Sequence, residues 1–240
     1  MKLALIGQGA MGQLVMMRAR DEGHEIALTL SSRDAERNVE ELAGLLRVVD
    51  VAIDFSVASA VLKNIKACAQ ANVPVVEGTT GWGDAKATAL EYVREHDGAL
   101  VYGANFSIGV NLFYRLVAHA AELFQATDDY APFIEESHHS RKRDAPSGTA
   151  LRLRDLLAAR LPWDIPIAST RAGHIPGTHR VGFDSIADQI TLVHTARSRE
   201  GFAAGALAAA RWIQGHRGIY EFSEVFDQIL KKVMSKKSDE

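Results

Sequence analysis

Apolar residues follow two alternating patterns through residues 1–103 of the chain. Short aliphatic and β-branched runs predict strands, and the segments between them carry apolar residues at helical spacing. The predicted strands are Lys2–Ile6, Glu25–Leu30, Val48–Asp54, Val73–Glu77 and Ala99–Gly103. The predicted helices are Gly12–Glu22, Asp34–Leu45, Ser59–Ala71 and Asp84–Glu95. This alternation indicates βαβ units and a parallel sheet that is covered by helices on both faces.

The pattern changes after Asn105. An amphipathic helix is predicted over Leu112–Phe124, because Leu112, Leu116, Ala120 and Leu123 recur at helical spacing. Further elements are expected at Ala131–Glu136 (strand), Ser147–Leu161 (helix), Ile165–Thr170, His179–Ser185 and Gln189–Arg197 (antiparallel strands) and Phe202–Gln214 (helix). The tail turns charged at Lys231 and is expected to fray. A second, smaller α+β region is therefore predicted after the parallel sheet.

Composition narrows the class of protein. The 240 residues are 47% hydrophobic and 24% charged, as in an ordinary globular chain. The net charge of −3 argues against a general nucleic-acid binder, and the single cysteine, Cys68, excludes an intramolecular disulfide framework. No stretch has the apolar length of a membrane span or a signal peptide, so we expect a cytoplasmic protein with no membrane partner.

A glycine-rich turn follows the first predicted strand and opens the first helix. It reads Gly7-Gln8-Gly9-Ala10-Met11-Gly12. Gly7 permits the tight turn, Gly9 lets the backbone approach a pyrophosphate, and Gly12 lets the helix pack closely on the sheet. The helix N-terminus stabilises the anion. In this strand–turn–helix context the motif predicts a dinucleotide site in a Rossmann-type domain, although a purely structural turn is the alternative.

The end of the second predicted strand bears on the choice of dinucleotide. An acidic residue there would bind the ribose hydroxyls and disfavour a 2′-phosphate. The chain instead reads Ser31-Ser32-Arg33-Asp34, and the hydroxyl of Ser32 and the guanidinium of Arg33 suit a phosphate. The alternative is that Ser32 or Asp34 only caps the next helix. We expect NADPH to be favoured over NADH, with use of both left open.

A basic segment lies between the predicted strand Ala131–Glu136 and the helix that follows it. Five of the six residues from His138 to Arg143 are basic. Alone, such a run is most often a solvated loop, and the histidines lack the spacing of a metal site, so no metal is expected. Ser147, Gly148 and Thr149 come next and offer hydroxyls and free backbone N–H groups for a carboxylate. The segment therefore suits a small polyanionic substrate.

At these residues the chain resembles the 4-hydroxy-tetrahydrodipicolinate reductase (dihydrodipicolinate reductase) family of diaminopimelate and lysine biosynthesis. The pattern HHxxKxDAPSGTA stands at His138 to Ala150. Further matching motifs occur in the family's order along nearly the whole chain: Gly7–Gly12, Asp54-Phe55-Ser56, Gly78-Thr79-Thr80-Gly81, Asn105 to Asn111, and Arg171-x-Gly173-x-Ile175-x-Gly177-x-His179. The His-His motif is highly specific, whereas the glycine turn alone is not.

The resemblance implies a reaction and a role for each motif. NAD(P)H would reduce a cyclic hydroxylated dicarboxylate with loss of water. His138 would donate or accept a proton, Lys142 would be the second proton donor, and His139, Ser147, Gly148 and Thr149 would bind substrate. The residues implied in cofactor binding are Gly7, Gly9, Met11, Gly12, Ser32, Arg33, Phe55, Gly78, Thr79, Thr80, Gly103, Asn105 and Phe106.

The resemblance also implies an organisation. Residues 1–106 and 200–240 would form the dinucleotide-binding domain, and residues 107–199 the substrate-binding, catalytic and oligomerisation domain of a homotetramer. Two other hypotheses share the Rossmann-type half. A different amino-acid dehydrogenase has no reason to contain His-His-x-x-Lys followed by Ser-Gly-Thr, and a non-catalytic NADP(H)-binding regulator would tolerate the loss of Lys142.

Overall fold

The computed structural model describes the backbone of residues 1–238 and the side chains of residues 1–235. Two compact units are present, and their boundaries cut the chain twice. The first unit comprises Met1–Ile108 together with the segment that begins at Arg199, and the second comprises Gly109–Ser198. In the described part of the chain, no helix combines the length and the apolar character needed to cross a membrane.

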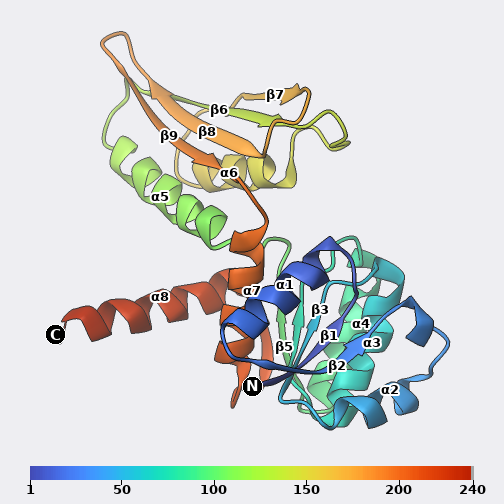
Figure 1. The fold of residues 1–240 in the computed structure, drawn as a ribbon. Helices are drawn as coiled ribbons and strands as arrows, with labels where there is room; N and C mark the ends of the chain where they lie inside the picture. Colours follow the sequence, from blue (N-terminus) through green and yellow to red (C-terminus); the bar gives the residue numbers. More distant parts are fainter. Residues whose placement is uncertain (239–240) are drawn as a thin grey trace. The chain divides into compact units, whose positions relative to one another are not determined.

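The first unit is built on a six-stranded parallel sheet in the order β10-β5-β4-β3-β1-β2 (Figure 1). Its strands are β1 (Lys2–Ile6), β2 (Glu25–Leu30), β3 (Val51–Asp54), β4 (Val75–Glu77), β5 (Ala99–Tyr102) and β10 (Gly218–Glu221). β3 is buried along its whole length, as a strand covered on both faces must be. The parallel-sheet, Rossmann-type class expected from the sequence is therefore confirmed.

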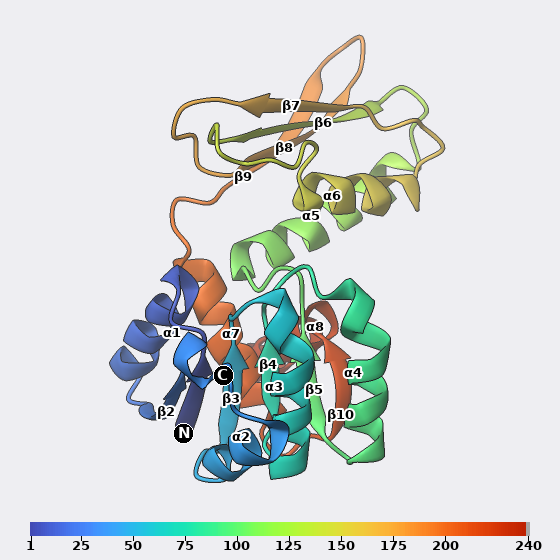
Figure 2. The ribbon, with the colours of Figure 1, turned by 90° about the vertical axis from the view of Figure 1, so that its right-hand side faces the viewer.

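Helices cover both faces of this sheet (Figure 2). One face packs on α1 (Ala10–Asp21), α7 (Glu200–Ile213) and the start of α8 (Phe222–Ser238). The other face packs on α2 (Val39–Leu46), α3 (Ala58–Ala71) and α4 (Gly83–Glu95). Successive strand residues point to opposite faces, so Leu3 and Leu5 serve one core and Ala4 and Ile6 the other.

The second unit is a four-stranded sheet with two helices on one face. The sheet order is β7-β6-β8-β9, formed by β6 (Ala131–His138), β7 (Ile167–Arg171), β8 (Thr178–Asp184) and β9 (Gln189–Thr195). α5 (Ile108–Phe124) and α6 (Gly148–Ala158) bury their apolar sides against it, around Ile134, Val181 and Phe183. The predicted second α+β region is therefore present.

Several local expectations were wrong. The helix expected from Asp34 begins at Val39, because Asn38 and Glu41 form a capping box there, and a short 3₁₀ turn, Ser32–Asp34, precedes it. The segment expected as an antiparallel strand before Arg171 pairs with β6 in parallel, although β8 and β9 are antiparallel as expected.

The C-terminal tail also differs from the expectation of fraying. β10 adds a sixth strand beside β5, and α8 continues through Ser238, with residues 239–240 outside the described part. Phe222, Val225 and Phe226 are buried at helical spacing, so they anchor α8 in the first unit's core.

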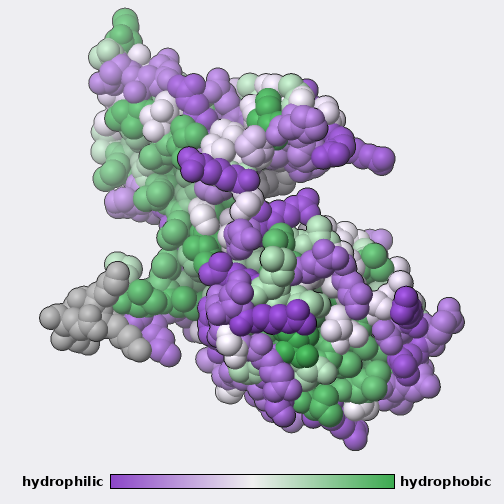
Figure 3. Space-filling view, in the orientation of Figure 1, coloured by the Kyte–Doolittle hydropathy of each residue, from purple (hydrophilic) through white to green (hydrophobic). Residues whose placement is uncertain are grey.

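The apolar stripe predicted on the long helix of the second unit is largely exposed. Leu112, Leu116 and Leu123 are 40%, 59% and 63% exposed, and the apolar surface over α5 is visible in Figure 3. The core-facing side of α5 instead carries Phe113, Val117 and Ala121. Helical spacing identified the helix but could not tell which of its two apolar stripes the unit covers.

Two helical glycines give a matched test of packing in the first unit. A Cβ at Gly205 of α7 would lie 1.8 Å from the carbonyl oxygen of Phe106, whereas nothing lies within 4 Å of one at Gly44 of α2. Gly205→Ala should therefore lower the free energy of unfolding by about 1–3 kcal/mol or more through overpacking. Gly44→Ala should raise it by up to about 1 kcal/mol through helix propensity. Urea unfolding of both variants checks this, and a neutral Gly205→Ala would contradict the packing described.

Candidate active site

The carboxyl ends of the parallel strands bring most of the expected cofactor residues to one edge of the first sheet. The loops after β1, β3, β4 and β5 follow strands that are neighbours in the order β5-β4-β3-β1. Because β1 and β3 are adjacent while α1 and α3 lie on opposite faces, the chain reverses its direction of winding between them. Open α/β sheets bind ligands outside the strand ends at such a point.

The glycine turn has a backbone that side chains would block. Gly7 has φ +94°, and a Cβ there would lie 2.4 Å from the carbonyl oxygen of Phe55. A Cβ at Gly12 would lie 1.9 Å from the carbonyl oxygen of Gly7. By contrast, no atom lies within 4 Å of a Cβ at Gly9, the N-cap of α1, which makes no side-chain capping bond. The turn is therefore tightly packed on the protein side and open at Gly9, as backbone that receives a phosphate must be.

The loops after β3 and β4 are packed against each other. A Cβ at Gly78 would lie 2.2 Å from the ring of Phe55, and that ring meets the ring of Phe106 edge to face at 6.2 Å. The backbone N–H of Thr79 donates to the carboxyl of Glu77 at 2.7 Å, and Thr80 is exposed. These contacts fix the conformation of the loop. Thr80 takes no part in them.

In the loop after β5, the ring of Phe106 is buried in the core. It lies between Phe55 and Phe222. A Cβ at Gly103 would lie 2.9 Å from Phe222 and 3.4 Å from the ring of Phe106. The side-chain oxygen of Asn105 accepts the backbone N–H of Ser107 at 2.9 Å. Met11 is also partly buried against this core. Phe106 and Met11 therefore support the edge from within the core.

The end of β2 places Ser32 and Arg33 in an exposed 3₁₀ turn. Ser31, not Ser32, caps this turn, and Asp34 completes the capping box by accepting the backbone N–H of Ser31 at 2.9 Å. Asp34 also pairs with Arg37 at 3.0 Å. The capping role considered for Ser32 is therefore taken by its neighbour, and Arg33 makes no ion pair among the described residues.

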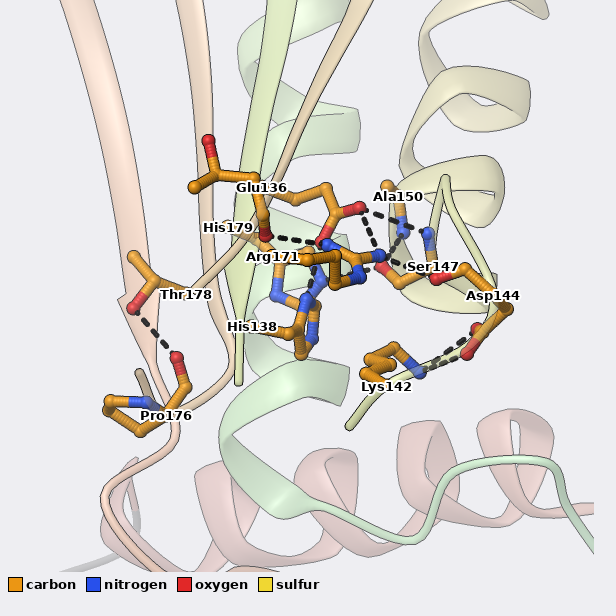
Figure 4. Close-up of polar contacts among 11 residues, drawn as sticks. Glu136, His138, Lys142, Asp144, Ser147, Ala150, Arg171, Pro176, Thr178 and His179 are labelled. Atoms are coloured by element: carbon orange, nitrogen blue, oxygen red, sulfur yellow. Dashed lines mark hydrogen bonds and ion pairs between the residues drawn. The ribbon is translucent and has the colours of Figure 1, made fainter. Parts of the chain in front are cut away.

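A buried carboxylate organises the second unit's polar cluster (Figure 4). Glu136 is 1% exposed and lies two residues before the end of β6. Its carboxylate hydrogen-bonds Nδ1 of His138, and it accepts a bidentate pair of bonds from Arg171 at 2.7 and 2.9 Å. The backbone N–H of Ser147 donates to it at 3.3 Å. One carboxylate thus joins the candidate catalytic histidine to β7 and to the start of α6.

These contacts set the protonation states in the cluster. Burial acts to raise the pKa of Glu136, but hydrogen bonds led by that from Arg171 outweigh it and lower this pKa to about 2. Burial lowers the pKa of His138 despite the neighbouring carboxylate. Glu136 is therefore ionised and His138 neutral near pH 7, so Nδ1 of the imidazole donates and Nε2 carries the lone pair.

A second histidine lies beside the first. Nε2 of His179 and the hydroxyl of Ser147 are 3.0 Å apart, and the ring lies edge to face with that of His138 at 5.1 Å. Burial is the main cause that lowers the pKa of His179 to about 4, and protonation of His138 acts in the same direction. His179 therefore stays neutral and holds Ser147 at the N-cap of α6, where the Ser147 hydroxyl also accepts the N–H of Ala150.

Lys142 and the N-terminus of α6 lie on the exposed side of the cluster. The ammonium of Lys142 pairs with both carboxylate oxygens of Asp144, at 2.8 and 2.9 Å. The pair with Lys142, together with the backbone N–H of Gly148, lowers the pKa of Asp144. Burial raises the pKa of Tyr114 of α5, and the side chain of Thr149 acts against this rise. The carboxylate of Asp144 thus lies near both Lys142 and Gly148, so this corner accommodates a negative charge.

His139 follows His138 but faces a different environment. Its carbonyl oxygen accepts the backbone N–H of Lys142 at 3.1 Å, closing the turn, and its ring Nδ1 is buried without a hydrogen-bond partner. The structure thus brings His138, Ser147, Gly148 and Lys142 into one polar corner and places His139 at the turn that supports it.

Glu136, His138 and His179 also form a group with ligand atoms within 4.8 Å of one another. Arg171 already donates to both oxygens of Glu136. A fixed guanidinium against the carboxylate disfavours a second cation at the same place. The chemistry of this donor set therefore suits proton transfer.

Three residues of this cluster received no role from the sequence: Glu136, Arg171 and His179. Sheet pairing brings them together, since His138 lies opposite Arg171 in the parallel pair and Glu136 lies opposite His179 in the antiparallel pair. Arg171 and His179 stand at the two ends of a quoted motif, which could have indicated them, whereas Glu136 lies two residues before the His138–Ala150 pattern.

Comparisons with known proteins agree over most of the chain. The family model described as dihydrodipicolinate reductase, N-terminus, matches residues 1–106, and the model described as dihydrodipicolinate reductase, C-terminus, matches residues 109–226. A 4-hydroxy-tetrahydrodipicolinate reductase from Christiangramia forsetii is 38% identical over 243 residues, covering 96% of this chain and all of its own. Its counterpart from Archaeoglobus fulgidus is 34% identical and covers 89% of this chain and 94% of its own.

Solved structures support the fold. A dipicolinate-bound dihydrodipicolinate reductase from Paenisporosarcina sp. TG-14 superposes with a TM-score of 0.76 at 23% identity, covering 92% of this chain and 97% of its own. A probable dehydrogenase from Thermotoga maritima gives a TM-score of 0.62 at 12% identity, with coverage of 99% and 97%. The expected NAD(P)H-dependent oxidoreductase class is confirmed by the family matches. The chain belongs to the dihydrodipicolinate reductase family.

Proposed function

We propose that the chain carries out the 4-hydroxy-tetrahydrodipicolinate reductase reaction of diaminopimelate and lysine biosynthesis with the residues assembled above. In this reaction the hydroxylated ring gains one hydride and one proton and loses one water, which yields tetrahydrodipicolinate. NAD(P)H, when bound, supplies the hydride. The observation that carries the proposal is the Glu136–His138 contact beside Lys142 and the α6 N-terminus, because it joins a proton carrier to an anion site.

The first unit is proposed to hold the dinucleotide. Gly7, Gly9 and Gly12 would receive the pyrophosphate at the N-terminus of α1, where Gly9 leaves the backbone open. Ser32 and Arg33 would hold the adenosine end. The nicotinamide end would lie along the remaining loops, formed by Phe55, Gly78, Thr79, Thr80, Gly103 and Asn105, with Met11 and Phe106 supporting them from the core.

The second unit is proposed to bind the dicarboxylate. One substrate carboxylate would accept the backbone N–H groups of Gly148 and Thr149, which start α6. Ser147 is held in place by His179, and His139 would contact the ring from the neighbouring turn. A substrate carboxylate at this corner competes with Asp144 for the same donors, so binding would release the carboxylate of Asp144 from Gly148.

His138 and Lys142 are proposed to move the protons. His138 is neutral, and its Nε2 can take a proton from the carbon next to the hydroxyl and return one to the ring. Glu136 stabilises the imidazolium that forms in between, as a buried carboxylate on Nδ1 does. The Lys142 ammonium donates a proton to the departing hydroxyl, which leaves as water. The carbon that carried the hydroxyl would then take the hydride, and the neutral amine of Lys142 would regain its proton from solvent.

We also propose a cytoplasmic homotetramer built through the second unit. The sheet face opposite α5 and α6 carries no helix of that unit, and Phe133 and the 58% exposed Val193 lie on it. An open sheet face with apolar side chains is typical of a subunit contact. NAD(P)H, the proposed cosubstrate, is a cytoplasmic metabolite, which supports the location.

Removal of the Lys142 ammonium tests the proton-donor role. Lys142→Ala should lower kcat by at least about a hundredfold, because a general acid is lost, while the Kd for NADPH stays unchanged. Arg143→Ala, which removes an exposed cation from the adjacent position, is the control and should retain turnover. Unchanged turnover in Lys142→Ala would remove this residue from the mechanism.

Substitution of Arg33 tests the prediction that the end of β2 binds the 2′-phosphate of NADPH. Arg33→Ala should raise the KM for NADPH about tenfold and leave that for NADH unchanged, because the lost guanidinium contacts only the 2′-phosphate. Arg37→Ala is the matched control, since Arg37 is engaged with Asp34. Equal effects on both cofactors would contradict a phosphate-binding role for Arg33.

The oligomer is tested by light scattering. The wild type should have four times the 26.1 kDa mass of the chain. Val193→Glu should dissociate it by burying a charge at the contact, whereas Val48→Glu, at an exposed position of the first unit, should not. A monomeric wild type would contradict the proposed assembly.

A further inference from the structure

Two fully buried acidic residues lie side by side under the candidate cofactor edge. Asp54 ends β3 and Glu77 ends β4, and the two are register partners in the parallel pair. Both are 0% exposed. Their strand face is the one covered by α2, α3 and α4, so the two carboxyl groups point into an otherwise apolar layer.

Each carboxyl holds the loop that follows its own strand. Oδ1 of Asp54 accepts the backbone N–H of Ser56 at 2.7 Å, and its other oxygen accepts the side-chain amide of Asn64 at 2.8 Å. Oε1 of Glu77 accepts the backbone N–H of Thr79 at 2.7 Å. Oε2 of Glu77 is buried and has no protein donor.

No cation compensates this pair among the described residues, because neither carboxyl forms an ion pair. The titratable groups that face it are the Cys68 thiol of α3 and Tyr102 of β5, which is the register partner of Glu77. Lys86 of α4 lies over the Tyr102 ring, 4.2 Å from its centroid. Two adjacent charges in such surroundings would repel each other strongly.

The hydrogen bonds indicate where a proton must lie. Burial raises the pKa of Glu77 well above its ordinary value, and the charge of Asp54 raises it further. Burial also raises the pKa of Asp54, but hydrogen bonds from Ser56, Asn64 and Glu77 work against that rise. A proton on Oε2 of Glu77, donated to Asp54, satisfies the one oxygen that has no other partner.

We propose that Asp54 and Glu77 share one proton and act as a positioning pair that fixes the loops at Phe55–Ser56 and Gly78–Thr80. Asp54 is the charged member and Glu77 the neutral donor. The role in cofactor positioning rests on the proposed function, whereas the shared proton does not. Through Ser56 and Thr79 the pair sets the separation of two neighbouring loops at the sheet edge.

The shared proton predicts how stability depends on pH. Glu77 takes up a proton more readily in the folded than in the unfolded chain. Its contribution to the free energy of unfolding is therefore fully present below the ordinary glutamate pKa and is lost as pH rises through the raised pKa of the folded chain. Glu77→Gln keeps a donor toward Asp54 and an acceptor for Thr79 but cannot ionise. Its Tm should therefore rise relative to wild type by about 3–5 °C per pH unit above pH ~5, until Glu77 ionises in the folded wild type.

Thermal unfolding of the ligand-free proteins from acidic to alkaline pH measures this difference. Glu91→Gln, at an exposed site on α4, is the matched control and should show a constant offset. A constant offset in Glu77→Gln as well, or a loss of stability that does not depend on pH, would overturn the shared proton.

The positioning role is tested by NADPH binding. The two carboxyl oxygens of Asp54 accept hydrogen bonds from Ser56 and Asn64, and an asparagine side chain has only one oxygen. In Asp54→Asn either Ser56 or Asn64 therefore loses its acceptor, and the Kd for NADPH should rise about tenfold or more. Glu77→Gln should bind NADPH as the wild type does at neutral pH. An unchanged Kd in a folded Asp54→Asn variant would overturn the positioning role. A wild type that fails to bind NADPH would instead count against the proposed function, and the unfolding data would still decide the shared proton.

Discussion

The carboxylate of Glu136 fixes the geometry on which the candidate chemistry depends. It is buried at the end of β6 and is kept ionised by the bidentate contact with Arg171. An ionised carboxylate on Nδ1 of His138 fixes the ring orientation and its tautomer, and the same carboxylate holds the N–H of Ser147. The histidine, the β7 terminus and the start of α6 are therefore joined at one charge. Loss of that charge would leave the partly buried guanidinium of Arg171 without its ion-pair partner and would release His138 and Ser147.

The first unit uses the same physical constraint. A buried carboxyl must find donors, and the nearest donors at a strand end are the N–H groups of the loop that follows. Asp54 and Glu77 accept such groups from Ser56 and Thr79. Burial of an acidic residue in a core costs free energy, but here these two residues stabilise the loops that follow β3 and β4. In both units the rigid strand sets the place of the acid, and the acid sets the place of the loop.

The sequence predicted the parallel sheet and the motif segments, because periodicity and glycine spacing are local properties of the chain. It did not predict the roles of Glu136, Arg171 and His179, since these residues meet only through the pairing of β6 with β7 and β8. β10 was also missed, because a four-residue strand at the edge of a sheet has too little pattern of its own. The spacing of Leu112, Leu116 and Leu123 predicted α5 but could not show that the unit covers the other apolar side of this helix.

Oxidation of NADPH by the purified protein, with 4-hydroxy-tetrahydrodipicolinate generated by enzymatic synthesis, tests the central claim most directly. We expect consumption of NADPH that requires both the protein and this substrate, and a parallel assay with NADH gives the cofactor preference. Tight binding of NADPH without consumption would contradict the proposed reaction, because the His138–Lys142 site would then not be the site of a reductase.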